Sequence, residues 1–319
     1  MTVSSKPRRI LVTGGAGFIG SHLARRLLAA GHEVLVLDDL SNGTLANVPQ
    51  GATFLEGDIA ATETWDQLKG QSFDTVCHLA AQSSGTLSFT DPVRDMRSHL
   101  PGTFLLLEEC KARGVRRVVY ASSTTTYGEP ERLPVDETHP QRPQTYYALG
   151  KSCVERCLEF HAQLGLEHTI LRMPNVYGPG QNLENRFQGM VSIYLAEMLA
   201  GRPVLVKGGS ERFRDFIHVD DVVQAWMLAL ESPVAIGKTY NLGSGVASTV
   251  GEVLRCLKAA WGEPDYPVNF EGGTAGDQHG MRLDISRIQA ELGFQPAYGL
   301  AEGIAHMVTE EKKRMQHEQ

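Results

Sequence analysis

The sequence predicts an α/β fold, a doubly wound parallel sheet with a smaller C-terminal α/β lobe. Short β-rich runs alternate with helical stretches through the first half of the 319 residues, the pattern of a parallel sheet covered on both faces. A glycine-rich turn joins the first run to the first helical stretch. Beyond Pro174 the alternation stops, and glycine and proline separate shorter elements.

The first half of the sequence is expected to supply most of the large sheet. Strands are predicted at residues 9–13, 33–38, 53–55, 75–79, 117–121 and 168–172. Helices are predicted at residues 21–30, 93–113 and 146–164, the first two ending at Gly31 and Gly114. Pro101 lies inside the second of these helices and is expected to kink it.

The second half is expected to begin with a loop at residues 175–181 and a helix at 189–200. Strands at 204–207 and 216–218 and a helix at 220–230 should follow. We predict one domain over residues 1–174, with residues 216–235 packing back on it, and a second lobe over residues 175–319. The sequence shows no internal repeat, and it shows no linker between the two parts.

Composition and charge exclude several classes of function. The formal net charge is −7, so neither a nucleic-acid partner nor an anionic membrane is expected. No apolar stretch reaches transmembrane length. The 5 cysteines lack metal-ligand spacing, so we expect no metal site and a reduced, cytoplasmic protein.

The turn after the first predicted strand has the spacing of a dinucleotide-binding loop. Gly14, Gly17 and Gly20 allow a tight turn, close approach of a diphosphate, and close packing of helix on strand. The diphosphate is expected at the helix N-terminus, beside Phe18 and Ile19, where free N–H groups and the helix dipole favour anions. This is the turn of a Rossmann fold.

An acidic residue ends the second predicted strand. Asp38 can accept hydrogen bonds from both hydroxyls of a ribose and would repel a 2′-phosphate, so NAD is preferred over NADP. The following residues, from Asp39 to Gly43, include no arginine or lysine. Asp58 and Ile59 could contact the adenine, although an acid in such a loop is equally often a helix cap.

Tyr147 and Lys151 are four residues apart at the start of the third predicted helix. This spacing places both side chains on one face of the helix, where an ammonium would lower the pKa of the phenol toward working pH and make it a base. A Ser/Thr run that begins with Ser122 and Ser123 ends the strand before that helix, at the sheet edge where ligands bind.

The sequence resembles the extended short-chain dehydrogenases/reductases of the nucleotide-sugar epimerase/dehydratase family, and within them the UDP-hexose 4-epimerases. The resemblance runs from residue 9 to about residue 300. It is carried by GGAGFIG (14–20), VLDDLSNG (36–43), GDI (57–59), HLAAQ (78–82), SSTTTYG (122–128), YYALGK (146–151), NVYGPGQ (175–181) and RFRDFIHVDD (212–221).

The resemblance implies NAD as cofactor, a nucleotide sugar as substrate, most often a UDP-sugar, and a homodimer built on the two long helices. In such enzymes Tyr147 would take a proton from a sugar hydroxyl while hydride moves to NAD⁺; Lys151 would hold the ribose and Ser123 the reacting oxygen. The implied cofactor contacts are Gly14, Gly17, Phe18, Ile19, Gly20, Asp38, Asp39, Asn42, Gly43, Asp58, Ile59, Leu79, Ala80, Ala81, Tyr147, Lys151 and Pro174. The implied substrate contacts are Ser83, Ser123, Thr124, Thr125, Tyr147, Asn175, Arg214 and Asp277.

The residues after Ser123 discriminate between reactions of the family. Related 4,6-dehydratases carry Asp-Glu where this chain has Thr124 and Thr125, and decarboxylating relatives usually keep a Glu at the second position. A threonine hydroxyl cannot act as acid or base near neutral pH. The pattern therefore favours simple oxidation and reduction, such as 4-epimerisation of a UDP-hexose or UDP-hexuronic acid.

The sequence departs from the family pattern at several positions. His99 stands where asparagine is usual, Gly150 where serine is usual, and Pro174 where an aromatic residue is usual. Thr274 replaces an arginine that often binds the diphosphate, and Met281 lies where 4-epimerases size the sugar pocket. For Arg214 the alternative to a diphosphate ligand is an ordinary ion pair with Asp215 or Asp220.

Three other functions stay open at this point. One is a reductase or dehydrogenase that exchanges NAD(P)(H) with solution. Another is an epimerase that acts at a different carbon or on a different nucleotide sugar. The last is a non-catalytic NAD-sensing protein, which would be expected to lose the tyrosine or the lysine that this chain keeps.

Overall fold

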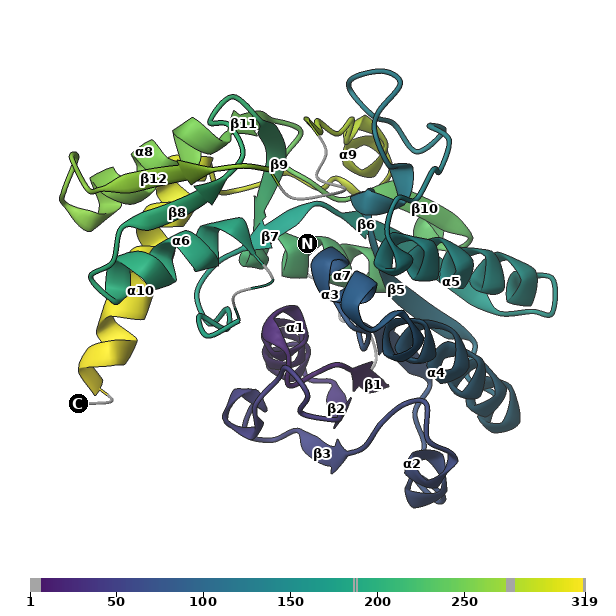
Figure 1. The fold of residues 1–319 in the computed structure, drawn as a ribbon. Coiled ribbons are helices and arrows are strands. Elements are labelled where there is room, and N and C mark those ends of the chain that lie inside the picture. The colour runs from purple at the N-terminus through teal and green to yellow at the C-terminus, as the bar shows by residue number, and fades with distance from the viewer. Residues whose placement is uncertain (1–6, 186, 188, 274–278, 318–319) are drawn as a thin grey trace.

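A seven-stranded parallel sheet lies at the centre of the computed structural model, which describes residues 7–185, 187, 189–273 and 279–317 (Figure 1). From edge to edge its strands are β10 (Lys238–Asn241), β6 (Glu167–Met173), β5 (Arg117–Ser123), β4 (Thr75–His78), β1 (Arg9–Thr13), β2 (Glu33–Asp38) and β3 (Thr53–Glu56). Every neighbouring pair is parallel. The predicted α/β fold class is confirmed.

Strand order reverses between β1 and β4. The chain runs outward from β1 through β2 to β3, then returns to β4 on the other side of β1 and continues through β5 and β6. The carboxyl ends of β1 and β4 are therefore adjacent at the point of reversal, which is where open parallel sheets bind their ligands.

Helices cover both faces of this sheet (Figure 1). On one face α1 (Phe18–Ala29) packs beside α7 (Val219–Glu231), and Val12, Leu27 and Trp226 belong to its core. On the other face α4 (Pro92–Arg113) packs beside α5 (Tyr146–Ala162), and the core contains Leu11 and Leu107. Leu11 and Val12 serve opposite faces because successive strand residues alternate.

A third core lies in the C-terminal part of the chain. Helices α6 (Met190–Leu199), α8 (Val250–Trp261) and α10 (Leu300–His317) contribute to it, with strands β8 (Val204–Lys207) and β12 (Val268–Glu271) pairing beside them. A three-stranded sheet of β11 (Ala247–Thr249), β9 (Phe213–His218) and β7 (Asn175–Tyr177) lies near the sheet's carboxyl edge. The described helices include none that is long and apolar enough to cross a bilayer.

The predicted helices and strands are present, with ends that differ by a few residues. Elements for which no range was predicted are β7, β10, β11, β12, α8, α10, α2 (Thr62–Gln67), α3 (Gly85–Thr90), α9 (Ser286–Leu292) and three short 3₁₀ turns, Leu45–Asn47, Thr124–Tyr127 and Pro233–Ala235. The segment predicted as a loop at 175–181 begins with β7, which forms because it pairs with distant β9. Helix α4 continues through Pro101. The domain boundary at residue 174 stays a prediction.

Candidate active site

The turn between β1 and α1 requires glycine for close packing at two positions. Gly14 has φ of +71°, and a Cβ there would lie 2.7 Å from the nitrogen of Ala80 at the end of β4. A Cβ on Gly20 would overlap the Gly14 carbonyl oxygen. Around Gly17 the only described atom within 4 Å of a Cβ is that carbonyl oxygen at 3.2 Å, so this side of the turn is open. Gly17 also starts α1 without a side-chain cap, so the first-turn N–H groups suit the diphosphate of a dinucleotide.

Asp38, at the end of β2, connects this turn to the segment after β2. Its Oδ2 accepts from the Ala16 N–H at 2.9 Å and its Oδ1 from the Leu40 N–H at 2.9 Å. Burial raises the pKa of Asp38, and these backbone bonds oppose the increase. A carboxylate oxygen has more than one lone pair, so both ribose hydroxyls could still be bound. The structure fits NAD at this edge.

Several other predicted cofactor contacts follow the ends of β2, β3 and β4, while Pro174 follows β6. Asp58 is already engaged, because its carboxylate pairs with Arg97 at 2.9 Å and accepts from the Ala60 N–H at 2.8 Å. These contacts close a turn before α2, whose N-cap is Ala61 and has no side-chain cap, so both interpretations of Asp58 stay predictions. Asn42 accepts a hydrogen bond from Asn185 at 3.0 Å, which links the segment after β2 to the C-terminal part of the chain.

Tyr147, Lys151 and Ser123 are brought together where β5 ends and α5 begins. The Thr145 hydroxyl caps α5 by accepting from the Ala148 N–H at 3.0 Å, which starts the helix at Tyr146. Tyr147 is hydrogen-bonded to Ser123, the last residue of β5. The Lys151 ammonium donates to the Ala121 carbonyl at 2.7 Å and lies 5.8 Å from the centre of the Tyr147 ring.

Burial controls the acid–base properties of this group. It raises the pKa of Tyr147 to about 12, against the lowering effect of the bond to Ser123. It lowers the pKa of Lys151 to about 7, against the negative charges of Asp95 and Glu155. The expected net lowering of the tyrosine pKa is wrong for the chain by itself, because desolvation of the phenolate is the largest effect on it.

A pocket of about 200 Å³ opens beside these residues. It is lined by Ser123, Thr124, Thr125, Gln144, Thr145, Ala148, Pro174, Asn175, Arg214 and Met281. Most of the predicted substrate contacts thus surround one cavity, and Thr125 donates to Ser123 at 2.9 Å. Sequence reasoning missed Gln144, Thr145 and Ala148, although a threonine directly before the Tyr-x-x-x-Lys helix is an N-cap signal. Asp277 and Thr274 lie outside the described residues.

Arg214 projects into this pocket from β9. Its Nη1 donates to the carbonyl oxygens of Phe213 at 2.8 Å and His279 at 3.1 Å, and burial lowers its pKa to about 10. Asp215, considered as an ion-pair partner, accepts hydrogen bonds from Ser244 and Gly245. A guanidinium oriented by carbonyl groups at the wall of a pocket suits a diphosphate.

Two departures from the family pattern meet on the far side of Tyr147. A Cβ on Gly150 would lie 2.6 Å from Cδ2 of His99, so the glycine in α5 makes room for the imidazole from α4. The His99 carbonyl accepts from Thr103 Oγ1 at 2.5 Å, and Thr103 contacts His78 of β4 at 3.1 Å. His99 and Gly150 are thus complementary.

This complementarity predicts a coupled pair of substitutions. Gly150→Ser should lower the free energy of unfolding by about 1–3 kcal/mol, because the new side chain overlaps the His99 ring in a packed site. His99→Asn combined with Gly150→Ser should recover most of that loss. Chemical denaturation of the wild type, both single variants and the double variant measures the coupling. Additive losses would show that the two residues do not interact.

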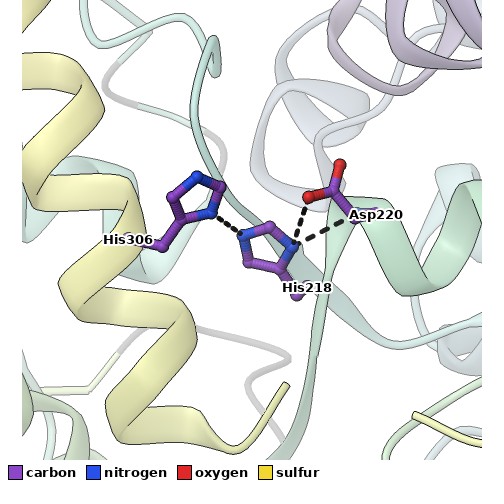
Figure 2. Close-up of side chains that lie close together, drawn as sticks. All are labelled: His218, Asp220 and His306. Atoms are coloured by element: carbon purple, nitrogen blue, oxygen red, sulfur yellow. Dashed lines mark hydrogen bonds and ion pairs between the residues drawn. The ribbon is translucent and has the colours of Figure 1, made fainter. Parts of the chain in front are cut away.

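His218, Asp220 and His306 form a separate cluster where α10 meets α7 (Figure 2). The buried His218 caps α7 by accepting from the Asp220 N–H at 3.2 Å, as its position before the helix predicts. Its other ring nitrogen lies 3.3 Å from His306. Asp220 and His306 lie on opposite sides of the His218 ring (Figure 2), and one ligand atom from each of the three residues lies within 4.8 Å of the other two. The cluster joins two helices.

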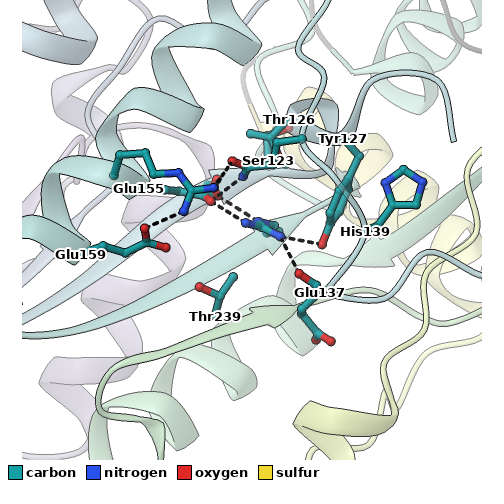
Figure 3. A network of polar contacts seen from close by, with 12 residues as sticks. Ser123, Thr126, Tyr127, Glu137, His139, Glu155, Glu159 and Thr239 are labelled. Carbon is teal, nitrogen blue, oxygen red and sulfur yellow. Dashed lines mark hydrogen bonds and ion pairs between the residues drawn. The ribbon is translucent and has the colours of Figure 1, made fainter. Parts of the chain in front are cut away.

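Buried polar contacts support the floor of the site, where α5 crosses β6 (Figure 3). The Glu155 carboxylate accepts from Nε of Arg172 at 3.0 Å and from its Nη2 at 2.6 Å, and also from Ser122. Arg172 continues the network by donating to the Tyr127 hydroxyl at 2.9 Å. Glu155 lies one helical turn after Lys151, so this ion pair anchors the helix that carries the candidate base.

Comparisons with known proteins agree with this geometry. A model of the NAD-dependent epimerase/dehydratase family matches residues 10–243. A UDP-glucose 4-epimerase of Mycolicibacterium smegmatis is 39% identical over 307 residues, covering 94% of this chain and 97% of that protein. The UDP-glucose 4-epimerase of Thermotoga maritima, solved with UDP-glucose, superposes with a TM-score of 0.92 at 36% identity, covering 96% and 99% of the two chains. The Thermus thermophilus enzyme, solved with NAD, gives 0.88 at 37% identity, covering 95% and 99%.

Proposed function

The chain belongs to the NAD-dependent epimerase/dehydratase family, its cofactor is NAD, and we propose that it is a 4-epimerase of a UDP-hexose or UDP-hexuronic acid. The observation that carries the proposal is the pocket beside Tyr147 and Ser123, which combines hydroxyl groups with Arg214 and whose described lining includes no carboxylate. The similarity to UDP-glucose 4-epimerases over nearly the whole chain supports it.

Each step of the proposed reaction is assigned to a residue of the candidate site. NAD⁺ held by the glycine turn, Asp38 and Lys151 would supply the acceptor for a hydride from C4 of the sugar and the donor for its return to the opposite face of the ring. Tyr147 takes the proton from the 4-hydroxyl as that bond to hydrogen breaks and gives it back when the carbonyl is reduced. Ser123, hydrogen-bonded to Tyr147, donates to the same oxygen. The protonated Lys151 favours the phenolate and holds the cofactor ribose.

Nucleotide recognition is proposed for the side of the pocket away from Tyr147. Arg214 would bind the diphosphate and Asn175 would support it from β7. Met281 forms part of the wall beside Pro174, and its flexible side chain limits the space for substituents on the sugar. Elimination or decarboxylation would need an acid–base carboxylate where Thr124 and Thr125 line the pocket.

Cofactor retention and turnover test the proposal together. Purified protein should carry bound NAD and interconvert UDP-glucose and UDP-galactose with no cofactor added, because hydride leaves and returns within one turnover. An absolute requirement for added NAD(H), with a net change in its absorbance, would instead identify a dehydrogenase or reductase. Bound NAD without turnover of UDP-, GDP-, CDP- or dTDP-sugars would identify a cofactor-binding protein.

A homodimer is the proposed assembly. Val93 and Phe104 on α4, and Leu149 and Phe160 on α5, are exposed apolar side chains spaced eleven residues apart, which places each pair on one face of its helix. We propose that a second copy of the chain covers these exposed side chains of the two long helices in the dimer. Sedimentation velocity should give twice the chain mass of 34.9 kDa, and Phe104→Glu should shift the protein toward monomer. A wild-type monomer at micromolar concentration would contradict the proposal.

A further inference from the structure

Asp95 and His99 form a buried pair of titratable groups on α4. Asp95 and His99 are each only 1% exposed. Asp95 Oδ1 lies 3.8 Å from His99 Nε2, one helical turn away. In the described part of the chain neither carboxylate oxygen of Asp95 has a hydrogen-bond partner, and His99 Nε2 has none either. A buried carboxylate is costly unless a nearby positive charge compensates it.

Lys151 in the candidate active site is the positive charge that acts on Asp95, where it lowers the pKa of the carboxyl against the larger effect of burial. His99 of α4 packs against α5: its ring occupies the space over Gly150 and lies 5.7 Å from the Tyr147 ring. Gly150 directly precedes Lys151, and the Lys151 ammonium lies 5.8 Å from the same tyrosine ring. The Asp95–His99 pair thus borders the two groups on which the proposed reaction depends.

Other titratable groups around Lys151 lie on β4, β5 and α5. His78 on β4 and Tyr120 on β5 lie close to one another, with ring centres 5.5 Å apart, and Lys151 is 5.0 Å from the Tyr120 ring. Glu155 on α5 is held by Arg172. Burial lowers the pKa of His78 to about 3, with Lys151 adding to the effect, so His78 is neutral. Asp95 is therefore the carboxylate near Lys151 that no arginine neutralises.

We propose that Asp95 and His99 are positioning residues for the reaction, with the Asp95 carboxylate as the negative charge that acts on Lys151 and the His99 ring packed against Gly150 beside Tyr147. The inference rests on the proposed function. It adds to that function a negative charge that affects the pH range in which Tyr147 and Lys151 have the protonation states needed for the reaction. His99 can exist in this place because Gly150 has no side chain.

The direction of the effect follows from electrostatics. A negative charge raises the pKa of every neighbouring group, and Asp95 opposes the burial that lowers the pKa of Lys151 to about 7. It also adds to the burial that raises the pKa of Tyr147. Burial raises the pKa of Asp95 itself to about 6, and Lys151 opposes that rise. Removing the charge should therefore lower the pKa values of Tyr147 and Lys151 together.

The test is the pH profile of kcat/KM for UDP-glucose with Asp95→Asn in the NAD-loaded protein. Both limbs of the profile should move to lower pH by about one unit, the order of magnitude that a nearby charge contributes to a pKa. Asp95→Glu keeps the charge and should restore the wild-type limbs. Glu109→Gln removes another carboxylate of α4, one paired with Arg113, and should leave the profile unchanged. Unmoved limbs in a folded Asp95→Asn protein would overturn the proposal.

A second measurement separates this proposal from the proposed function. Ultraviolet titration of tyrosinate in the NAD-loaded protein, with Tyr147→Phe as the blank, follows the phenol without any substrate. Its midpoint should fall by about one pH unit in Asp95→Asn, and Asp95→Ser offers the same test if the asparagine does not fit. If the wild type has no epimerase activity but Asp95→Asn still shifts the midpoint, only the proposed function is rejected. Normal turnover with an unshifted midpoint would reject only the role of Asp95.

Discussion

Tyr147→Phe is expected to lower kcat for UDP-hexose interconversion by about 10²–10⁴-fold, the range for removing a general base. The substitution deletes only the hydroxyl that is hydrogen-bonded to Ser123. The ring that packs 5.7 Å from His99 stays in place, so the pocket and the helix start should be preserved. KM should therefore change by no more than a few-fold, and the loss should fall on the chemical step.

Tyr146→Phe is the matched control for that experiment. Tyr146 is the preceding residue of the same helix, but 41% of it is exposed, and it packs against Phe89. Loss of its hydroxyl should leave kcat near the wild-type value. Bound NAD, measured after denaturation of each variant, should be the same in all three proteins. Equal turnover by Tyr147→Phe and the wild type would show that another group is the base.

The parts of the site that the sequence predicts best are those set by local spacing. Gly14, Gly17 and Gly20 form one tight turn, so their role could be read from their order along the chain. The spacing of Tyr147 and Lys151 likewise fixes a shared helix face. Ser123 could be added because the ends of parallel strands share one edge of the sheet.

The parts that the sequence did not predict depend on contacts between distant segments. β7 and β10 are short and carry no clear alternation, and each forms because a distant strand, β9 or β6, offers a pairing edge. His99 and Gly150 could each be recognised as unusual, but their complementarity appears only when α4 packs on α5. Desolvation also depends on the finished fold, which is why the direction of the Tyr147 pKa was predicted wrongly.

Glu155→Gln should have the largest effect on stability, lowering the free energy of unfolding by about 3–5 kcal/mol, the range for removing one partner of a buried ion pair. Glu155 is fully buried and Arg172 is 5% exposed, so the guanidinium would lose its counter-charge where water cannot replace it. The same guanidinium donates to Tyr127, whose hydroxyl donates to Asn241 of β10 at 2.6 Å. Loss of the Glu155 charge should therefore weaken the hydrogen bonds that connect α5 to the edge strand β10.

Glu159→Gln is the control for the loss of charge alone. Glu159 is on the exposed side of α5, where it pairs with Arg156 at 2.6 Å. This loss should cost less than about 0.5 kcal/mol, as exposed helix pairs do. Replacing both buried partners, by Glu155→Leu with Arg172→Met, should recover much of the loss, since an apolar pair leaves no uncompensated charge. Urea denaturation of the four proteins measures these differences. Similar losses for Glu155→Gln and Glu159→Gln would mean that the buried pair does not anchor α5, and the position of Lys151 would then depend on packing alone.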